Sequence, residues 1–389
     1  DESWGPRMDG QLIVQPLYGD EPAPFLPHPN NVRDFFETGR MNNTSVALST
    51  GSENSSLRLS ISNMNHDGML PGFEQERTTV ALAGGLGLTE RLRGEASLQY
   101  MNADASNRPA QGYGEDNVMW QFLWFGRQVD TEMLRRKRRN EDGSQYNWNN
   151  RWNNNPYWTQ LEDQNWDSRD RFIGGGSLTY GFTEWLDLMV RAGADVSSEH
   201  RKEVYAAGTK SVSSPTGAFG ETALSREEVN ADFLLSAEWP NLENYSINAT
   251  FGGSRRNNEY RRLGAWANEL VVPMLWDFGN SAVEVSTDDY REQTRVNSLY
   301  GSLSFGFRNV WFIEATGRND WSSTLPEANN SYFYPSVSGS LIVSDVFDLP
   351  GVSYGKLRLG WAQVGNDASA YQLVDPYVAD VAFGTAPRF

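Results

Sequence analysis

The sequence predicts an all-β protein of the transmembrane, antiparallel β-barrel class. Three observations predict it: apolar residues recur with period two from Asn42 onward, short connections alternate with long ones, and aromatic residues gather at the predicted strand ends. In a bacterial barrel the short turns face the periplasm and the long loops face outside. A soluble β-sandwich has the same alternation of residues but no reason to keep its loop lengths alternating.

The predicted strands are mostly about ten residues long, which is the length needed to cross a bilayer at a tilt. In one of them Leu188 and Val190 alternate with Arg191, and the apolar set is expected to face lipid. In the last, Leu359 and Trp361 take that role while Arg358 faces the other way. The strands are predicted at 42–50, 55–63, 77–88, 92–102, 170–182, 187–197, 226–239, 244–254, 293–307, 310–317, 334–343 and 354–364.

The connections between these strands fall into two groups. Aromatic rings flank several of the short ones, as expected for side chains at the headgroup level. These rings are Phe182, Trp185, Trp239, Tyr245, Phe307 and Trp311. The shorter connections are 51–54, 89–91, 183–186, 240–243, 308–309 and 344–353, and the long ones are 64–76, 103–169, 198–225, 255–292 and 318–333.

Composition excludes several functions. The net charge of −17 argues against a nucleic-acid partner, since phosphate binding requires a basic surface. Cysteine is absent and the three histidines lack metal-ligand spacing, so neither a metal site nor a cofactor is expected. No nucleophile elbow or phosphate-binding glycine loop is present, and the chain is therefore not expected to be an enzyme.

The stretch Gly317–Pro326, followed by Asn329–Ser338, resembles a signature of the SusC/RagA family of TonB-dependent outer-membrane transporters. Three more segments match that family in the same order: 3–11, 31–39 and 357–367. The signature residues, which include Asn319, Asp320, Trp321 and Pro335, are interpreted as barrel architecture. Asn319, Asp320 and the run Ser322–Thr324 are expected to close a loop through side-chain to backbone hydrogen bonds.

The resemblance implies a barrel of about 22 strands with a plugged lumen. The plug, the segment that engages TonB and the closing strands are not recognisable in the chain, which is expected to be part of a longer protein. Residues 1–41 are expected to form an extracellular lead-in segment and residues 42–389 an incomplete barrel wall, with 377–389 not a natural last strand.

The function that the resemblance implies is TonB-dependent active uptake of a large nutrient across the outer membrane. A SusD-like surface lipoprotein is the implied partner, in a dimer of transporter–lipoprotein pairs, and outer-membrane lipid or lipopolysaccharide surrounds the wall. An oligosaccharide is the predicted cargo. Oligopeptide uptake by the same machinery, and a passive porin or adhesin barrel, remain open.

The segment 103–169 holds the candidate substrate site. Its tryptophans are interleaved with asparagines, and flat rings beside amide groups suit a sugar. The alternative is that these rings pack the segment against itself or against a partner. The proposed substrate-binding residues are Trp148, Trp152, Trp158 and Trp166.

Two further features are ambiguous. The basic run Arg135–Arg139 fits either lipopolysaccharide phosphates, an acidic patch on a partner or a solvated loop face. The glycine cluster Gly174–Gly176 indicates either close approach of a plug to the wall or a local bulge.

Overall fold

The structure is a computed structural model that describes residues 5–149, 151–347, 350–373, 380–383 and 386–388. Antiparallel strands dominate it. Three short helices and five single 3-10 turns complete the described part. The helices are α1 (Val118–Phe122), α2 (Thr131–Arg136) and α3 (Pro156–Leu161), and the 3-10 turns cover Pro16–Tyr18, Arg33–Phe35, Phe278–Asn280, Glu327–Asn329 and Val343–Asp345.

Twelve strands form one sheet in which every strand pairs with its neighbours in sequence, in the order β14 to β3. All twelve predicted strands are confirmed. They are β3 (Arg40–Gly51), β4 (Ser55–Asp67), β5 (Glu74–Gly87), β6 (Leu92–Ser106), β7 (Gln164–Thr183), β8 (Leu186–Tyr205), β9 (Ala218–Leu242), β10 (Tyr245–Ala267), β11 (Ser286–Phe307), β12 (Trp311–Ser322), β13 (Ser331–Ile342) and β14 (Lys356–Ala362).

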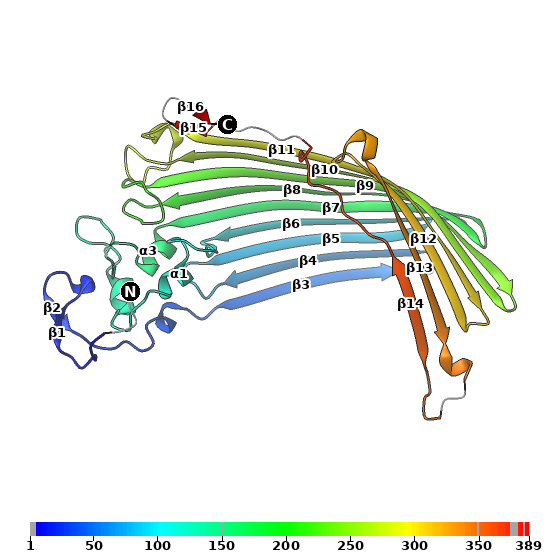
Figure 1. Cartoon of the computed structure of the whole chain (residues 1–389), viewed down its shortest axis with the longest axis horizontal. Helices are drawn as coiled ribbons and strands as arrows, with labels where there is room; N and C mark the ends of the chain where they lie inside the picture. Colours follow the sequence, from blue (N-terminus) through cyan, green and yellow to red (C-terminus); the bar gives the residue numbers. More distant parts are fainter. Residues whose placement is uncertain (1–4, 150, 348–349, 374–379, 384–385, 389) are drawn as a thin grey trace.

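Figure 1 shows this sheet as a single curved wall with β3 and β14 at its two edges. The wall is not closed into a barrel within the described residues. Two small ribbons lie outside it. One consists of β1 (Leu12–Val14) and β2 (Pro22–Pro24), and the other of β15 (Asp380–Phe383) and β16 (Ala386–Arg388).

Side chains alternate across the wall as the sequence predicts. Val190 and Leu359 are 52% and 72% exposed on the apolar outer face. On the inner face Arg191 bonds to Asp232 of the neighbouring strand at 3.0 Å. This is the pattern expected of a membrane wall: lipid offers no hydrogen bonds, so a continuous antiparallel ladder would satisfy the backbone and leave the apolar side chains to face hydrocarbon.

The connections keep the predicted alternation of short and long up to β13. At one end of the wall five of the six connections have two to four residues, but the one between β13 and β14, predicted as shorter at 344–353, is wrong because β13 ends at Ile342 and β14 begins only at Lys356. Aromatic rings meet at the short turns: Trp185 stacks on Trp239 at 5.4 Å, and Tyr245 lies 5.2 Å from Phe307. At the other end the strands run further than predicted. The connections predicted as long at 64–76 and 318–333 are therefore wrong, because strand pairing leaves only 68–73 and 323–330 outside the ladder.

The connection between β6 and β7 folds into a small helical unit at the long-loop end of the wall (Figure 1). Each helix starts at a polar N-cap: Asn117, Asp130 and Asn155 accept hydrogen bonds from backbone amides of the first turn. Pro156 follows Asn155 at the first helical position, where its missing N–H has no cost. We call residues 107–163 together with the segment 15–36 the loop unit.

The segment 15–36 is tied to the helices by apolar and polar contacts. The Phe35 ring lies 4.8 Å from that of Tyr157, and the Asn31 side chain donates to the carbonyl of Gly126 at 2.9 Å. Thr131 Oγ1 donates to the carbonyl of Asn31 at 2.7 Å. The core of the loop unit consists of Leu17, Phe35, Val118, Phe122, Phe125, Val129, Leu134, Trp148 and Tyr157.

No helix among the described residues has the length and apolar character needed to cross a membrane. Some residues on which the sequence-based predictions rest lie outside the described ranges. The signature residues Ser3 and Trp4 lie there, as do 377–379, 384–385 and 389 of the ending that the sequence predicts to be irregular.

Candidate functional site

The inner face of the wall carries a ladder of ion pairs close to the loop unit. Arg171 Nε donates to Asp195 Oδ1 at 2.8 Å across β7 and β8. One step nearer the loops, Arg169 Nη2 donates to Glu199 Oε2 at 2.6 Å. A planar guanidinium binds a carboxylate through paired hydrogen bonds, so these contacts hold the two strands in one register and fix the orientation of both charges.

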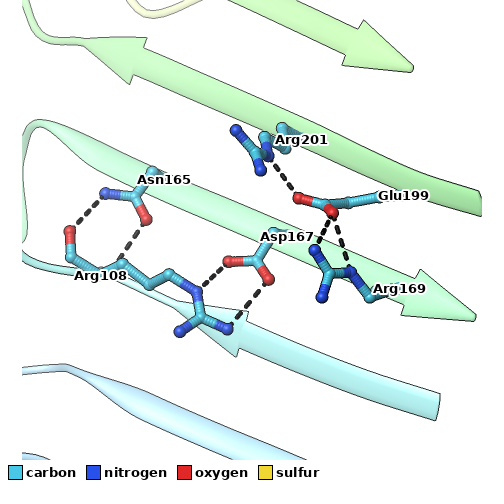
Figure 2. Close-up of polar contacts among 6 residues, drawn as sticks. All are labelled: Arg108, Asn165, Asp167, Arg169, Glu199 and Arg201. Atoms are coloured by element: carbon cyan, nitrogen blue, oxygen red, sulfur yellow. Dashed lines mark hydrogen bonds and ion pairs between the residues drawn. The ribbon is translucent and has the colours of Figure 1, made fainter. Parts of the chain in front are cut away.

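Glu199 is the centre of this ladder. Its side chain is 6% exposed, and it accepts from Arg169 on one oxygen and from Arg201 on the other, as Figure 2 shows. A buried carboxylate without partners would be strongly unfavourable. Two guanidiniums compensate the charge of this one carboxylate. The group formed by Arg169, Glu199 and Arg201 therefore carries a net positive charge on the inner face of the wall.

Arg108 joins the loop unit to the same ladder. Its guanidinium makes a two-point contact with Asp167, with Nη2 lying 3.1 Å from Oδ2. Its backbone exchanges two hydrogen bonds with the Asn165 side chain, both at 2.9 Å (Figure 2). The loop therefore leaves the wall at a point that is fixed by both backbone and side-chain contacts.

A cavity of ≈ 640 Å³ lies between this ladder and the loop unit. Its lining combines guanidiniums, carboxylates and amides with a smaller number of apolar and aromatic side chains. This size suits a short oligomeric ligand, and the mixture of charges suits a ligand that carries both signs. The polar residues of the lining include Gln75, Arg77, Asn107, Arg108, Asp116, Gln160, Asp163, Asn165, Asp167, Arg169, Glu199, Arg201 and Glu203.

Asp163 lines the cavity and connects the loop unit to the loop between β8 and β9. One carboxylate oxygen accepts from the Ala206 amide at 2.9 Å, and the other accepts from Thr209 Oγ1 at 2.6 Å and from Ser211 Oγ at 3.3 Å. The residue lies outside the membrane-spanning strands. Burial raises the pKa of Asp163 from 3.8 to about 7, against the opposing effect of these hydrogen bonds.

The four candidate tryptophans do not form one surface. Trp158 is fully buried and Trp148 is 5% exposed, with its Nε1 donating to the carbonyl of Asn154 at 3.1 Å. Trp152 is 59% exposed and Trp166 is 38% exposed at the cavity margin. Two of the rings thus pack the loop unit, as the alternative from sequence holds, and two remain accessible. Their contact with a substrate stays a prediction.

The signature residues occupy the β12–β13 pair. Asn319 and Asp320 lie within β12, opposite Phe333 and Tyr332, and so do not close a loop as the sequence suggested. Trp321 is 36% exposed, and Pro335 lies opposite Gly317 in the ladder. The β12–β13 ladder continues past the predicted end of the strand. There the side chains bond to residues of the two strands and not to a loop: Asn319 Nδ2 donates to Ser331 Oγ at 2.9 Å, and Arg318 Nε donates to Asp320 Oδ1 at 2.8 Å.

Loop closure at this signature is provided by a residue that sequence reasoning did not single out. Asp367 accepts from Ser322 Oγ at 2.6 Å and from Thr324 Oγ1 at 3.3 Å. Two separate signature segments, 317–326 and 357–367, therefore meet here. The sequence marks Asp367 as the last residue of the second segment. It does not indicate that this segment contacts the first one.

The two ambiguous features of the sequence have local explanations. Arg138 and Arg139 of the basic run pair with Glu162 within the loop unit, Arg138 at 3.3 Å.

A Cβ on Gly175 would lie 2.9 Å from the carbonyl oxygen of Ala192, so the neighbouring strand approaches closely there. The β7–β8 register is regular at this glycine, which excludes a bulge.

Among the described side chains, no three His, Asp or Glu residues come together as a metal site requires.

Comparison with known proteins supports the sequence-based resemblance. No family model matches the chain. The TonB-dependent receptors P26 and P3 of Formosa agariphila are 22% and 21% identical over 96% and 78% of this chain. The chain spans 38% and 30% of their lengths.

Solved structures share the fold. The RagAB peptide transporter superposes with a TM-score of 0.74 at 17% identity, over 92% of this chain and 41% of that one. The ferripyoverdine receptor of Pseudomonas aeruginosa superposes with a TM-score of 0.51 at 13% identity, over 79% of this chain and 40% of that one. The predicted resemblance to TonB-dependent transporters, the β-barrel fold and the outer-membrane location are thereby confirmed.

Proposed function

We propose that the chain forms part of the barrel of a TonB-dependent transporter that takes up a large nutrient across the outer membrane. The observation that supports this most is the cavity at the loop end of the inner wall, bounded by the Arg169–Glu199–Arg201 group and the loop unit. A concave site with several convergent polar groups suits capture of a ligand.

The geometry favours a charged oligopeptide over the oligosaccharide that the tryptophan-rich segment predicted. Guanidiniums and carboxylates line the cavity, and they complement the two charged ends of a peptide. Trp148 and Trp158, half of the predicted sugar platform, are buried. The similarity in fold to a peptide transporter is consistent with this choice.

An oligosaccharide remains the second candidate because Trp152 and Trp166 are exposed. Trp166 belongs to the cavity margin, while its place before Asp167 in the regular β7–β8 register puts its ring on the outer face of the wall. Such rings offer stacking faces to sugars, and both are retained in this proposal as substrate-binding residues.

The proposed assembly follows the sequence-based expectation. A SusD-like surface lipoprotein would cover residues 1–41 and the long loops, TonB would act on a part of the protein outside this chain, and two transporter–lipoprotein pairs would form a dimer. RagAB, which shares the fold, is named as a peptide transporter.

The test is ligand binding to the full-length protein purified from outer membranes, with a charged oligopeptide library and a neutral oligosaccharide library compared directly. Arg201→Gln is expected to weaken peptide binding about tenfold, because one charge-assisted hydrogen bond is lost. Arg93→Gln is the matched control, since Arg93 pairs with Glu95 on the same wall but does not line the cavity. Retained peptide binding in Arg201→Gln, or saccharide binding alone, would overturn the peptide assignment.

Energy coupling is tested separately by uptake in cells with and without TonB. Uptake that does not depend on TonB would leave the passive barrel as the better account.

A further inference from the structure

We propose that the outer face of β9, β10 and β11 carries a binding site for the phosphorylated headgroup of an outer-leaflet lipid, formed by Arg255 and Arg295. The three strands are adjacent in the wall (Figure 1). The site lies on the face opposite the lumen, so it is independent of the cavity and of the transported cargo.

The lipid-facing band on these strands has a clear upper limit. Along β10 the outward positions run from Tyr245 to Phe251 and Gly253, and the next outward residue is Arg255. Along β11 they run from Phe307 to Leu299, and Asn297 and Arg295 follow. Each band covers about ten residues of strand, which is the length that crosses the hydrocarbon layer. Both arginines therefore lie just beyond the hydrocarbon, at the headgroup level on the loop side.

The two guanidiniums converge on one point. Arg295 Nε donates to Asn257 Oδ1 at 2.8 Å, and Arg255 Nε lies 3.5 Å from the same oxygen. This shared neutral acceptor uses little of the donor capacity of the two groups. Two convergent guanidiniums with free N–H groups match the oxygens of a phosphate monoester, which they bind through paired hydrogen bonds.

Neighbouring cations differ, because they already have carboxylate partners. Arg291 Nη2 lies 2.8 Å from Glu259 Oε1, and Arg261 Nε lies 3.7 Å from Asp289 Oδ1. Among the described side chains, Arg255 and Arg295 take part in no ion pair within 4 Å. They are accordingly the cations of this face that are available to an external anion.

A groove of ≈ 530 Å³ lies at the same place, lined by Arg255, Asn257, Glu259, Gln293, Arg295 and Ser323 among others. Glu227 also lines it. Glu259 is compensated by Arg291 and accepts from Gln293 at 2.9 Å, so three arginines face two glutamates. In a chain with net charge −17, this local positive excess directly above the lipid band favours an anionic headgroup.

The experiment uses the full-length protein in detergent, titrated with diphosphoryl lipid A and followed by native mass spectrometry. The double variant Arg255→Gln/Arg295→Gln is expected to bind at least about tenfold more weakly than the unmodified protein, because both phosphate donors are removed. Arg261→Gln is the matched control, since it removes a cation from the same face that is already paired. Arg255→Lys/Arg295→Lys is expected to restore part of the binding, because the charge returns without the planar fork.

Three results would overturn the proposal: equal binding by the double glutamine variant, equal binding of a dephosphorylated lipid with the same acyl chains, or complete displacement of the lipid by inorganic phosphate. The last would identify the source of the anion as free phosphate instead of lipid. Resistance of the folded barrel to unfolding in cold SDS, compared among all variants, separates loss of the site from loss of the fold.

Discussion

Asp367 accepts a hydrogen bond from Ser322 Oγ at 2.6 Å, and this contact joins two signature segments through residues that lie 45 positions apart in the sequence. Thr324 adds a second hydroxyl to the same carboxylate oxygen, at 3.3 Å. The segment after β14 is thereby fastened to the end of β12, on the loop side of the wall.

Replacing Asp367 with Asn should loosen this connection by about 1 kcal/mol, the usual contribution of a side-chain hydrogen bond. The hydrogen bond from Ser322 lowers the pKa of Asp367 below 3.8. The contact is therefore fully present above pH 3.8 and weakens as the pH falls through the lowered pKa. Hydrogen exchange of residues 363–371 measures this, with Asp345→Asn as a control; unchanged exchange in Asp367→Asn would contradict the role of the contact.

The Asp163 contact should depend on pH in the opposite sense. Because burial raises the pKa of Asp163 to about 7, the folded loop binds a proton that the unfolded chain releases. Its stability should fall by up to about 1.4 kcal/mol per pH unit between about pH 4 and 7, and level off above that range. Asp163→Asn should remove this slope. Urea denaturation followed by tryptophan fluorescence at several pH values tests it, and an identical slope in the variant would show that another group titrates.

Glu199→Ala should destabilise the wall near the loop unit, since Arg169 and Arg201 would face each other without their shared carboxylate. A loss of about 2 kcal/mol is expected, less than for a fully buried pair because both guanidiniums are partly exposed to water. Thermal unfolding in detergent measures it. Glu95→Ala, which removes the exposed partner of Arg93, serves as the control and should change stability little.

The tryptophans of the loop unit should separate into two groups. Trp158→Ala should destabilise the unit by about 3–5 kcal/mol, because it leaves a large cavity at a fully buried position. Trp152→Ala should change stability by no more than about 0.5 kcal/mol at its exposed position. Limited proteolysis of the loop unit compares the two variants. If Trp152→Ala also abolished oligosaccharide binding, the second cargo candidate would become the stronger one.

The strand number, the order of the strands and the face that each side chain presents were predictable because a barrel wall repeats one local rule. Leu188 and Val190 alternate with Arg191 whatever the rest of the chain does, since lipid lies on one side of the sheet and the lumen on the other. The same rule fails where lipid ends. Beyond the apolar band that faces lipid, outward residues such as Arg255 are polar, so apolar and polar residues no longer alternate. Strand pairing continues there nonetheless, and the strands predicted from alternation therefore end too early.

The candidate site could be located by sequence but not resolved into residues. Clustering of tryptophans at 103–169 indicated a segment that lines the cavity, yet the burial of Trp158 depends on where Phe35 and the helices fold around it. The ion-pair ladder was missed because its partners are 24 and 30 residues apart and meet only through the β7–β8 register. Local sequence patterns carry no signal for such pairs.

The barrel class, the twelve strands and the likeness to TonB-dependent transporters could be inferred without the structure, because all of them rest on short-range periodicity or on contiguous motifs. The tertiary structure decided which tryptophans remain accessible, how Asp367 meets Ser322, and that Arg255 and Arg295 converge on one amide oxygen. These depend on residues brought together across the sheet and between loops, where strand register and burial, and not sequence neighbourhood, set the distances between side chains.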